Sequence, residues 1–371
     1  MSRCVFATPT CASQRDGSCR GVPTLRGGRT LDVMTTFVDG ATGGATLREV
    51  AEAAGVSVST ASRALNGQRR VRRDLVERVR AAAMQVGYQP NLAARSLRTS
   101  RTMDLGLAFG RLDTPAALDL IDGLGQGTHE GGYHLLVTSA RGDATRHRDA
   151  LRHLLHRRVD GLLVSRPDGI GTEIADFGRQ GIPVLAMISA GEGAEDLPLV
   201  NVDLRPAFAD AFQSLARHGH RAIALLTEGY GLRPPRSRRL PDGTVVRVSR
   251  LAGTASAAEV VEALRVQREA DPPATALICD QRFMPTVVDV LRSWDLEFPR
   301  DVSLASYLDS RWMDELMTPP LAAIHIDVAE LGVVAARMMI AWLGGEEPPP
   351  LTRLPLSRWI ERPSVGAVPT L

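Results

Sequence analysis

Several short hydroxyl side chains and one long hydrogen-bond donor lie within seven residues of this sequence. Ser57, Ser59 and Thr60 can approach a polar surface closely, and Arg63 follows Ser59 by about one helical turn. Hydroxyl groups bind phosphate oxygens, and a guanidinium group can donate two hydrogen bonds to the edge of one guanine. These residue types in this spacing indicate nucleic-acid binding, although a solvent-facing helical hairpin would show the same pattern.

The residues before this group predict a helix that positions it. Thr46 and Glu49 have the spacing of a capping box, in which each side chain binds the other residue's backbone N–H, and Gly55 is expected to end the helix. Four apolar residues recur at i, i+3, i+4 and i+7 and form its inward face: Leu47, Val50, Ala51 and Ala54.

Two further helices follow. Ser57 is placed to cap the second, in which Ala61 and Leu65 face inward while Ser59, Thr60 and Arg63 do not. Residues 71–88 predict a third amphipathic helix that can close a small core. Its inward residues are Leu75, Val76, Val79, Ala82, Ala83 and Val86. We therefore predict a helix-turn-helix unit over residues 45–89.

Residues 46–98 resemble the lactose-repressor (LacI/GalR) family of bacterial transcription regulators. The matching pieces are A-G-V-S from Ala54, T-x-S-R from Thr60, L-N from Leu65 and G-Y-x-P-N-x-x-A-R-x-L from Gly87. The resemblance continues more loosely to about Ser364.

The resemblance implies a set of DNA contacts. Val58, Ser59 and Arg63 would read the major groove. Ala94 and Leu97 would lie in the minor groove, as part of a hinge helix within residues 90–101. The remaining candidates, which would contact mostly phosphates or cap the hinge helix, are Thr46, Ser57, Thr60, Asn66 and Asn91.

The hinge segment is too short to form a stable helix by itself. Pro90 prevents the third helix from continuing, and Asn91 can cap a new one. In the family this segment folds on DNA, where paired leucines wedge between base steps and kink the duplex, at a cost of a few kcal/mol that the bend's contacts offset. A plain linker is the alternative.

Charge is distributed unevenly along the 371 residues. Residues 45–101 contain 11 Arg and 4 Asp or Glu, whereas residues 102–371 carry a net charge of −7. The basic charge is therefore local to the proposed DNA-binding unit. Residues 1–44 show no helix or strand period and are expected to be a disordered extension. Met34 is then a candidate start site, and a basic DNA-binding arm is the alternative.

Apolar strands and amphipathic helices alternate from Asp104 onward, which predicts parallel sheets covered on both faces. The expected strands are 105–109, 134–138, 161–165, 184–188, 222–226, 275–279 and 302–305. The expected helices are 116–130, 146–157, 207–218, 255–269 and 283–294. Residues 365–371 are expected to form a tail.

The body, residues 102–364, is similar to the periplasmic-binding-protein-like sensor of the same family. That similarity implies two doubly wound α/β lobes, each discontinuous in sequence, a homodimer and a small sugar-like effector in the cleft. It places effector-binding carboxylates at Asp203 and Asp280, which accept hydrogen bonds from sugar hydroxyls. Each could equally be a strand-end or helix-capping residue.

This chain departs from the family pattern around the expected cleft. Two aromatic residues after Asn-Pro are replaced in Thr114-Pro-Ala-Ala117, and Gly-Phe-Asp-Asp becomes Ser306-Tyr-Leu-Asp309. An Arg-x-x-Gly-Phe helix is replaced by residues 229–243, a Pro/Arg loop that cannot be helical through its prolines. A clamping arginine is thus unaccounted for, and we expect either an unusual effector or a sensor that has lost one.

Other functions receive less support from the sequence. It contains no G-x-S-x-G, P-loop, H-E-x-x-H or strand-linked G-x-G-x-x-G motif, and Gly123 to Gly127 lie within a helical pattern. The cysteines lack C-x-x-C spacing, and His147, His153 and His156 are expected at the surface. We therefore expect no catalytic residue, metal or cofactor, and neither an enzyme nor an exported solute carrier.

We predict a cytoplasmic, dimeric repressor that binds a palindromic operator in double-stranded DNA. No apolar run approaches the ~20 residues that span a membrane, and the N-terminus lacks a continuous apolar signal core. A regulator that binds DNA constitutively and has a degraded sensor is the alternative.

Overall fold

The computed structural model divides the chain into two compact units, with the boundary between Pro90 and Asn91. It describes residues 45–65, 71–89, 101–112, 114–165, 169–188, 196–227, 237–240, 245–252, 256–309 and 314–368. In this part of the chain no helix combines the length and the apolar character needed to cross a membrane.

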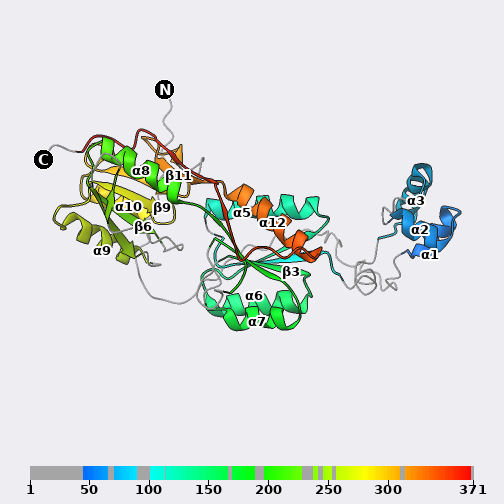
Figure 1. The fold of residues 1–371 in the computed structure, drawn as a ribbon. Coiled ribbons are helices and arrows are strands. Elements are labelled where there is room, and N and C mark those ends of the chain that lie inside the picture. The colour runs from blue at the N-terminus through cyan, green and yellow to red at the C-terminus, as the bar shows by residue number, and fades with distance from the viewer. Residues whose placement is uncertain are drawn as a thin grey trace, which may run out of the picture. The chain divides into compact units, whose positions relative to one another are not determined.

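The first unit is a three-helix head, as predicted (Figure 1). Its helices are α1 (Leu47–Ala53), α2 (Val58–Leu65) and α3 (Arg73–Gln85). The predicted capping box begins α1: the Glu49 N–H donates to the Thr46 hydroxyl over 3.4 Å, and the Thr46 N–H donates to the Glu49 carboxylate over 2.6 Å. Eight small or branched residues form the core: Val50, Ala51, Ala54, Ala61, Ala64, Val79, Ala82 and Ala83. Small side chains let three short helices pack closely.

The second unit contains two sheets, one in each lobe. The lobe 1 sheet has the strand order β12-β5-β4-β3-β1-β2 and is parallel throughout. Its strands are β1 (Asp104–Phe109), β2 (His134–Ser139), β3 (Gly161–Ser165), β4 (Val184–Met187), β5 (Leu199–Val202) and β12 (Leu351–Leu354).

The lobe 2 sheet has the order β13-β11-β10-β9-β6-β8-β7, with antiparallel strands at both edges. Its strands are β6 (Ala222–Thr227), β7 (Ser237–Arg239), β8 (Val245–Ala252), β9 (Ala276–Asp280), β10 (Ser303–Tyr307), β11 (Ala322–Ile326) and β13 (Ser357–Ile360). The short strand β7 lies within the predicted Pro/Arg loop and pairs antiparallel with β8, which follows the loop. The part of that loop from 228 to 236 lies outside the described residues.

Helices cover both faces of each sheet, which confirms the predicted architecture. In lobe 1, α5 (Pro115–Glu130) and α12 (Val328–Leu343) lie on one face, and α6 (Ala144–His156) and α7 (Gly171–Arg179) on the other (Figure 1). In lobe 2, α8 (Arg205–Arg217) packs on the face that holds Ile223 and Leu225. The opposite face holds Ala224 and Leu226 and packs against α9 (Ala257–Arg268) and α10 (Met284–Ser293).

The chain crosses between the lobes three times, after β5, after β11 and after β12. Hydrogen bonds join these crossings: the Asp203 N–H donates to the Leu354 carbonyl (2.8 Å), and the Asp327 N–H donates to the Leu356 carbonyl (2.9 Å). The Ser357 hydroxyl donates to the Asp203 carbonyl (2.5 Å). Each lobe is therefore discontinuous, as predicted, and the crossings form a narrow hinge.

Helices α5 and α12 approach closely because glycines lie at their contact. A Cβ atom on Gly123 would lie 1.9 Å from the Ala329 carbonyl oxygen, and one on Gly332 would lie 2.6 Å from the Leu120 carbonyl oxygen. Gly123 and Gly127 therefore serve helix packing, in agreement with the prediction that they lie within a helix.

Candidate nucleic-acid interface and ligand cleft

The N-terminus of α2 presents a cluster of hydroxyl groups. The predicted cap is present, because the Thr60 N–H donates to the Ser57 hydroxyl over 3.1 Å. The Ser57 hydroxyl lies 2.9 Å from that of Ser59 and 2.8 Å from that of Thr60. Ser57 and Ser59 are exposed and Thr60 is half-buried. The cluster thus holds small polar groups at the positive end of a helix, where anions are favoured.

The outward face of α2 also carries Val58 and Arg63. Val58 is 45% exposed, which is unusual for a branched apolar side chain in a core-forming helix. The Arg63 side chain is exposed and its Nε donates to the Ser59 carbonyl over 3.1 Å. This contact holds the guanidinium along the helix, on the same face as the hydroxyl cluster. The groups predicted to read bases are therefore available at the surface of the head.

The remaining predicted DNA contacts divide into two groups. Thr46 is exposed and its hydroxyl takes part in the α1 cap. Asn66, Asn91, Ala94 and Leu97 lie outside the described residues, as does the predicted hinge helix. Their roles stay predictions.

A cavity of about 330 Å³ lies between the two lobes. Strand ends from both sheets line it, including Phe109 of β1, Ser165 of β3 and Tyr307 of β10. First-turn residues of α5, α6 and α12 complete the wall. It therefore occupies the carboxyl ends of parallel strands, where ligands bind in doubly wound folds.

Two arginines from opposite lobes line this cavity. Arg111 follows β1, and its Nη1 would lie 2.8 Å from a Cβ atom on Gly142, so the side chain passes close over that backbone. Arg282 precedes α10 in lobe 2 and lies over the Phe283 ring at 5.3 Å. These two arginines bring guanidinium groups to the cavity. The sequence lacks the family's Arg-x-x-Gly-Phe motif, which would have supplied an arginine there.

Asp203, a predicted effector ligand, lies in the hinge. Arg205 binds its carboxylate through Nε (2.8 Å) and Nη2 (2.7 Å), and the Arg205 N–H donates over 3.1 Å. The hydrogen bonds from Arg205 lower the pKa of Asp203 to about 2. The neighbours Val202 and Leu204 line the cavity, but Asp203 is not among its described lining residues. Asp203 therefore has the geometry of a residue at the start of a helix, which is the alternative role that the sequence left open for it.

Asp280, the second predicted ligand, is 1% exposed at the end of β9. Its Oδ1 accepts the Arg282 N–H over 3.1 Å, and its carbonyl accepts the Phe283 N–H over 2.9 Å. Asp280 thus forms the turn that presents Arg282, and it is not among the described lining residues either. Direct contact of Asp203 or Asp280 with an effector stays a prediction.

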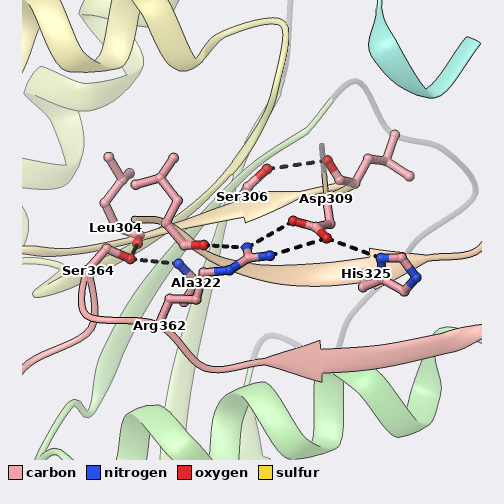
Figure 2. Close-up of polar contacts among 9 residues, drawn as sticks. Leu304, Ser306, Asp309, Ala322, His325, Arg362 and Ser364 are labelled. Atoms are coloured by element: carbon pink, nitrogen blue, oxygen red, sulfur yellow. Dashed lines mark hydrogen bonds and ion pairs between the residues drawn. The ribbon is translucent and has the colours of Figure 1, made fainter. Parts of the chain in front are cut away.

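A third carboxylate, Asp309, is fixed in a buried network (Figure 2). Arg362 donates to its Oδ1 over 2.9 Å and to the Leu321 carbonyl over 2.6 Å, and His325 Nδ1 lies 3.2 Å from Oδ2. Burial raises the pKa of Asp309, but hydrogen bonds with His325, Arg362 and Asp314 outweigh it, so the pKa lies well below its usual range. The network connects β10, β11 and β13 rather than facing the cavity.

One expectation about the histidines was wrong. His147 is only 5% exposed and lines the cavity, whereas His153 and His156 are exposed as predicted. His147 shares the buried face of α6 with Leu151 and Leu154, at i, i+4 and i+7. That spacing was the signal that could have placed it inside.

Comparisons with known proteins match most of the described chain in three segments. The model for bacterial regulatory proteins of the lacI family matches residues 46–91. A model for periplasmic binding proteins and the sugar-binding domain of the LacI family matches residues 102–230, and a periplasmic-binding-protein-like domain matches residues 212–365.

Individual relatives agree with these matches. The chain is 30% identical over 322 residues to the ribose operon repressor of Escherichia coli (strain K12), covering 80% of this chain and 92% of the relative. It is 26% identical to the HTH-type transcriptional repressor PurR of Glaesserella parasuis, covering 78% and 88%. Among solved structures, a lac repressor dimer bound to operator and the anti-inducer ONPF aligns with a TM-score of 0.67 at 22% identity, covering 87% of this chain and 99% of the other.

Proposed function

Because the chain belongs to the lacI family of bacterial regulatory proteins, we propose that it is a transcriptional repressor that binds an operator and responds to a small molecule in its cleft. The observation that carries the proposal is the exposed face of α2 within a matched helix-turn-helix head. Ser59 and Arg63 lie on that face, free to enter a major groove.

The proposal assigns the head residues to two tasks. Val58, Ser59 and Arg63 read base edges, and only such contacts set sequence preference. Thr46, Ser57, Thr60 and Asn66 position the head on the phosphates, and Asn91 begins the hinge helix. Ala94 and Leu97 enter the minor groove, where an apolar side chain can kink the duplex.

The proposal also includes two-fold symmetry and an effector. A homodimer presents two heads related by a dyad, so the operator is a palindrome. The effector binds between the lobes and changes their closure about the hinge, which alters the spacing of the heads. The 330 Å³ cavity supports a working sensor over the alternative of a constitutive regulator.

Selection of bound sequences from random DNA tests the DNA-binding role. The full chain is expected to enrich a palindrome, and Arg63→Ala is expected to lose about 1–3 kcal/mol of discrimination at one base pair in each half-site. Arg73→Ala is the matched control, since Arg73 is an exposed head arginine that pairs with Glu77 at 3.3 Å on α3. It removes the same charge and should leave the preferred sequence unchanged.

Two results would contradict the proposal. The full chain would fail to enrich any sequence at low salt, or Arg63→Ala and Arg73→Ala would select the same sequences as the unmodified protein. The first result rejects the DNA-binding function, and the second rejects only the role of Arg63.

A further inference from the structure

We propose that the cleft binds a small ring compound that is mainly apolar and carries one or two polar groups. The inference rests on the proposed function, because it takes the cleft as the effector site. It goes further by naming the chemical class of the effector, for which the sequence implied only a sugar-like molecule.

Apolar side chains from both lobes form most of the cavity wall. Lobe 1 contributes Phe109 at the end of β1 and Leu120 of α5, and lobe 2 contributes Leu308 after β10. Residues next to the crossings between the lobes add further branched side chains, which are Val202, Leu204, Ile326 and Val328. Such a wall binds chiefly by removing apolar surface of a ligand from water.

Two residues of the wall hold a branched side chain in a strained backbone conformation. Ile188 follows β4 in lobe 1 with a φ of 70°, and Leu308 follows β10 in lobe 2 with a φ of 68°. The left-handed region disfavours branched side chains, and residues held in it cluster at ligand sites. The Ile188 N–H donates to the Val200 carbonyl over 3.0 Å, and the Leu308 N–H donates to the Ile324 carbonyl over 3.2 Å. Each lobe therefore fixes an apolar side chain at the cavity in spite of its conformational cost.

The charged groups of the wall are engaged within the chain. The Asp143 carboxylate accepts the Arg146 N–H over 2.8 Å and so caps α6. Arg282 lies over the Phe283 ring. Further interactions within the chain involve Arg111, His147, Arg282 and Tyr307. A polar ligand group would exchange such contacts for new ones, so these side chains add little net affinity for a ligand with many hydroxyl groups.

Three other polar groups can bind a ligand. The Ser165 side chain is 3% exposed, lines the cavity and makes no hydrogen bond with the described residues. Thr114 also lines it, and its side chain does not cap α5. Asn201 accepts the Val202 N–H through Oδ1 over 2.7 Å, which leaves its amide nitrogen to donate. Three such groups satisfy one or two polar groups of a ligand. A free monosaccharide carries a hydroxyl on nearly every carbon, and each one buried without a partner weakens binding.

The volume of the cavity sets the size of the ligand. An apolar cavity of about 150 Å³ admits benzene, and this cavity measures about 330 Å³, so it admits a compound of one or two rings. A ligand that fills it contacts both lobes. Its apolar surface leaves water most completely when the lobes close on it, so it binds the closed form more tightly. That difference in affinity shifts the equilibrium between open and closed forms.

Calorimetric titration of the full chain tests the inference. The ring probes are para-cresol, benzyl alcohol, indole and coumarin, and the comparison sugars are ribose and glucose. At least one ring probe is expected to bind about tenfold more tightly than either sugar. Titration of that probe at several temperatures should give a negative heat-capacity change, which is the signature of apolar burial.

Two substitutions in the wall sharpen the test. Leu308→Asn and Ile188→Asn each replace an apolar surface with an amide, and asparagine adopts the left-handed conformation more readily than a branched residue. Both variants are therefore expected to fold and to bind the ring probe about tenfold more weakly. Leu316→Asn is the matched control, because Leu316 is 78% exposed and is not among the described lining residues. It should leave the affinity unchanged.

The outcomes separate this inference from the proposed function. The inference is overturned if either sugar binds as tightly as the best ring probe, if no ring probe binds, or if folded Leu308→Asn and Ile188→Asn retain the full affinity. Thermal unfolding of each variant without ligand shows whether it is folded. A protein that selects a palindrome but fails this test remains a repressor with another effector, whereas one that also ignores DNA lacks the proposed function.

Discussion

At the scale of single residues, His220 shows how burial sets the charge of a side chain. It is fully buried, with Nδ1 at 2.9 Å from the Thr275 hydroxyl and Nε2 at 2.9 Å from the Ser303 hydroxyl. Burial lowers the pKa of His220 to about 4, although a hydrogen bond to the Gly366 carbonyl acts in the opposite direction. The ring is therefore neutral in the folded protein at pH 7.

A neutral buried histidine makes stability depend on pH. The unfolded chain protonates this ring near pH 6.5, whereas the folded chain does so only near pH 4. The unfolded state then binds more protons between these values, so the free energy of unfolding falls as the pH decreases through this window. By pH 5 the loss from His220 is expected to be about 2 kcal/mol.

Urea unfolding of the unmodified chain and of His220→Asn at pH 7.5 and pH 5.0 measures this loss. All four tryptophans lie at or after Trp294, so their fluorescence follows the second unit. Comparing the two pH values within each protein removes the cost of the substitution itself. The unmodified chain should lose about 2 kcal/mol more than the variant, and equal losses would show that folding does not lower the pKa of His220.

Local residue roles could be predicted from the sequence, and long-range roles could not. The Thr46–Glu49 cap depends on four consecutive residues, and the structure confirms it. The environment of Asp203 depends on Arg205 and on crossings more than a hundred residues away, so its spacing after a strand could not decide whether it faces the cavity. Arg111 and Arg282 carried no motif, and only the fold brings them to one cavity.

At the scale of elements, the close packing of α5 against α12 makes a sharp prediction from two glycines two residues apart. A Cβ atom on Gly123 would collide with the Ala329 carbonyl, whereas one on Gly125 would have no atom within 4 Å. Gly123→Ala should lower the free energy of unfolding by about 1–3 kcal/mol because the helices must separate. Gly125→Ala should raise it by about 0.5–1 kcal/mol through helix propensity. Urea unfolding measures both, and losses of the same sign and size would contradict this packing.

The sequence predicted most of the body's long elements and missed several shorter ones. Two helices and six strands of the described body were not predicted: α7, α12, β5, β7, β8, β11, β12 and β13. The five predicted helices and seven predicted strands of the body all occur, with ends shifted by a few residues. The α12 helix was missed because α5 and the sheet enclose it, so apolar residues surround much of its circumference. The strands β12 and β13 were missed because they are short and carry arginines, as partly exposed edge strands can.

At the scale of the whole molecule, the proposed dimer predicts a strong dependence on operator symmetry. Once one head occupies a half-site, binding of the second becomes intramolecular, with an effective concentration that can raise affinity about 10²–10⁴-fold. The full chain should therefore bind a palindrome far more tightly than a single half-site.

A head fragment, residues 45–101, lacks the dimerising body and should bind each half-site independently. Because it retains 11 Arg against 4 acidic residues, its weak binding should keep a steep salt dependence. Fluorescence anisotropy with labelled palindrome and half-site DNA measures all four affinities. Equal binding of both DNAs by the full chain would show that the two heads do not act together.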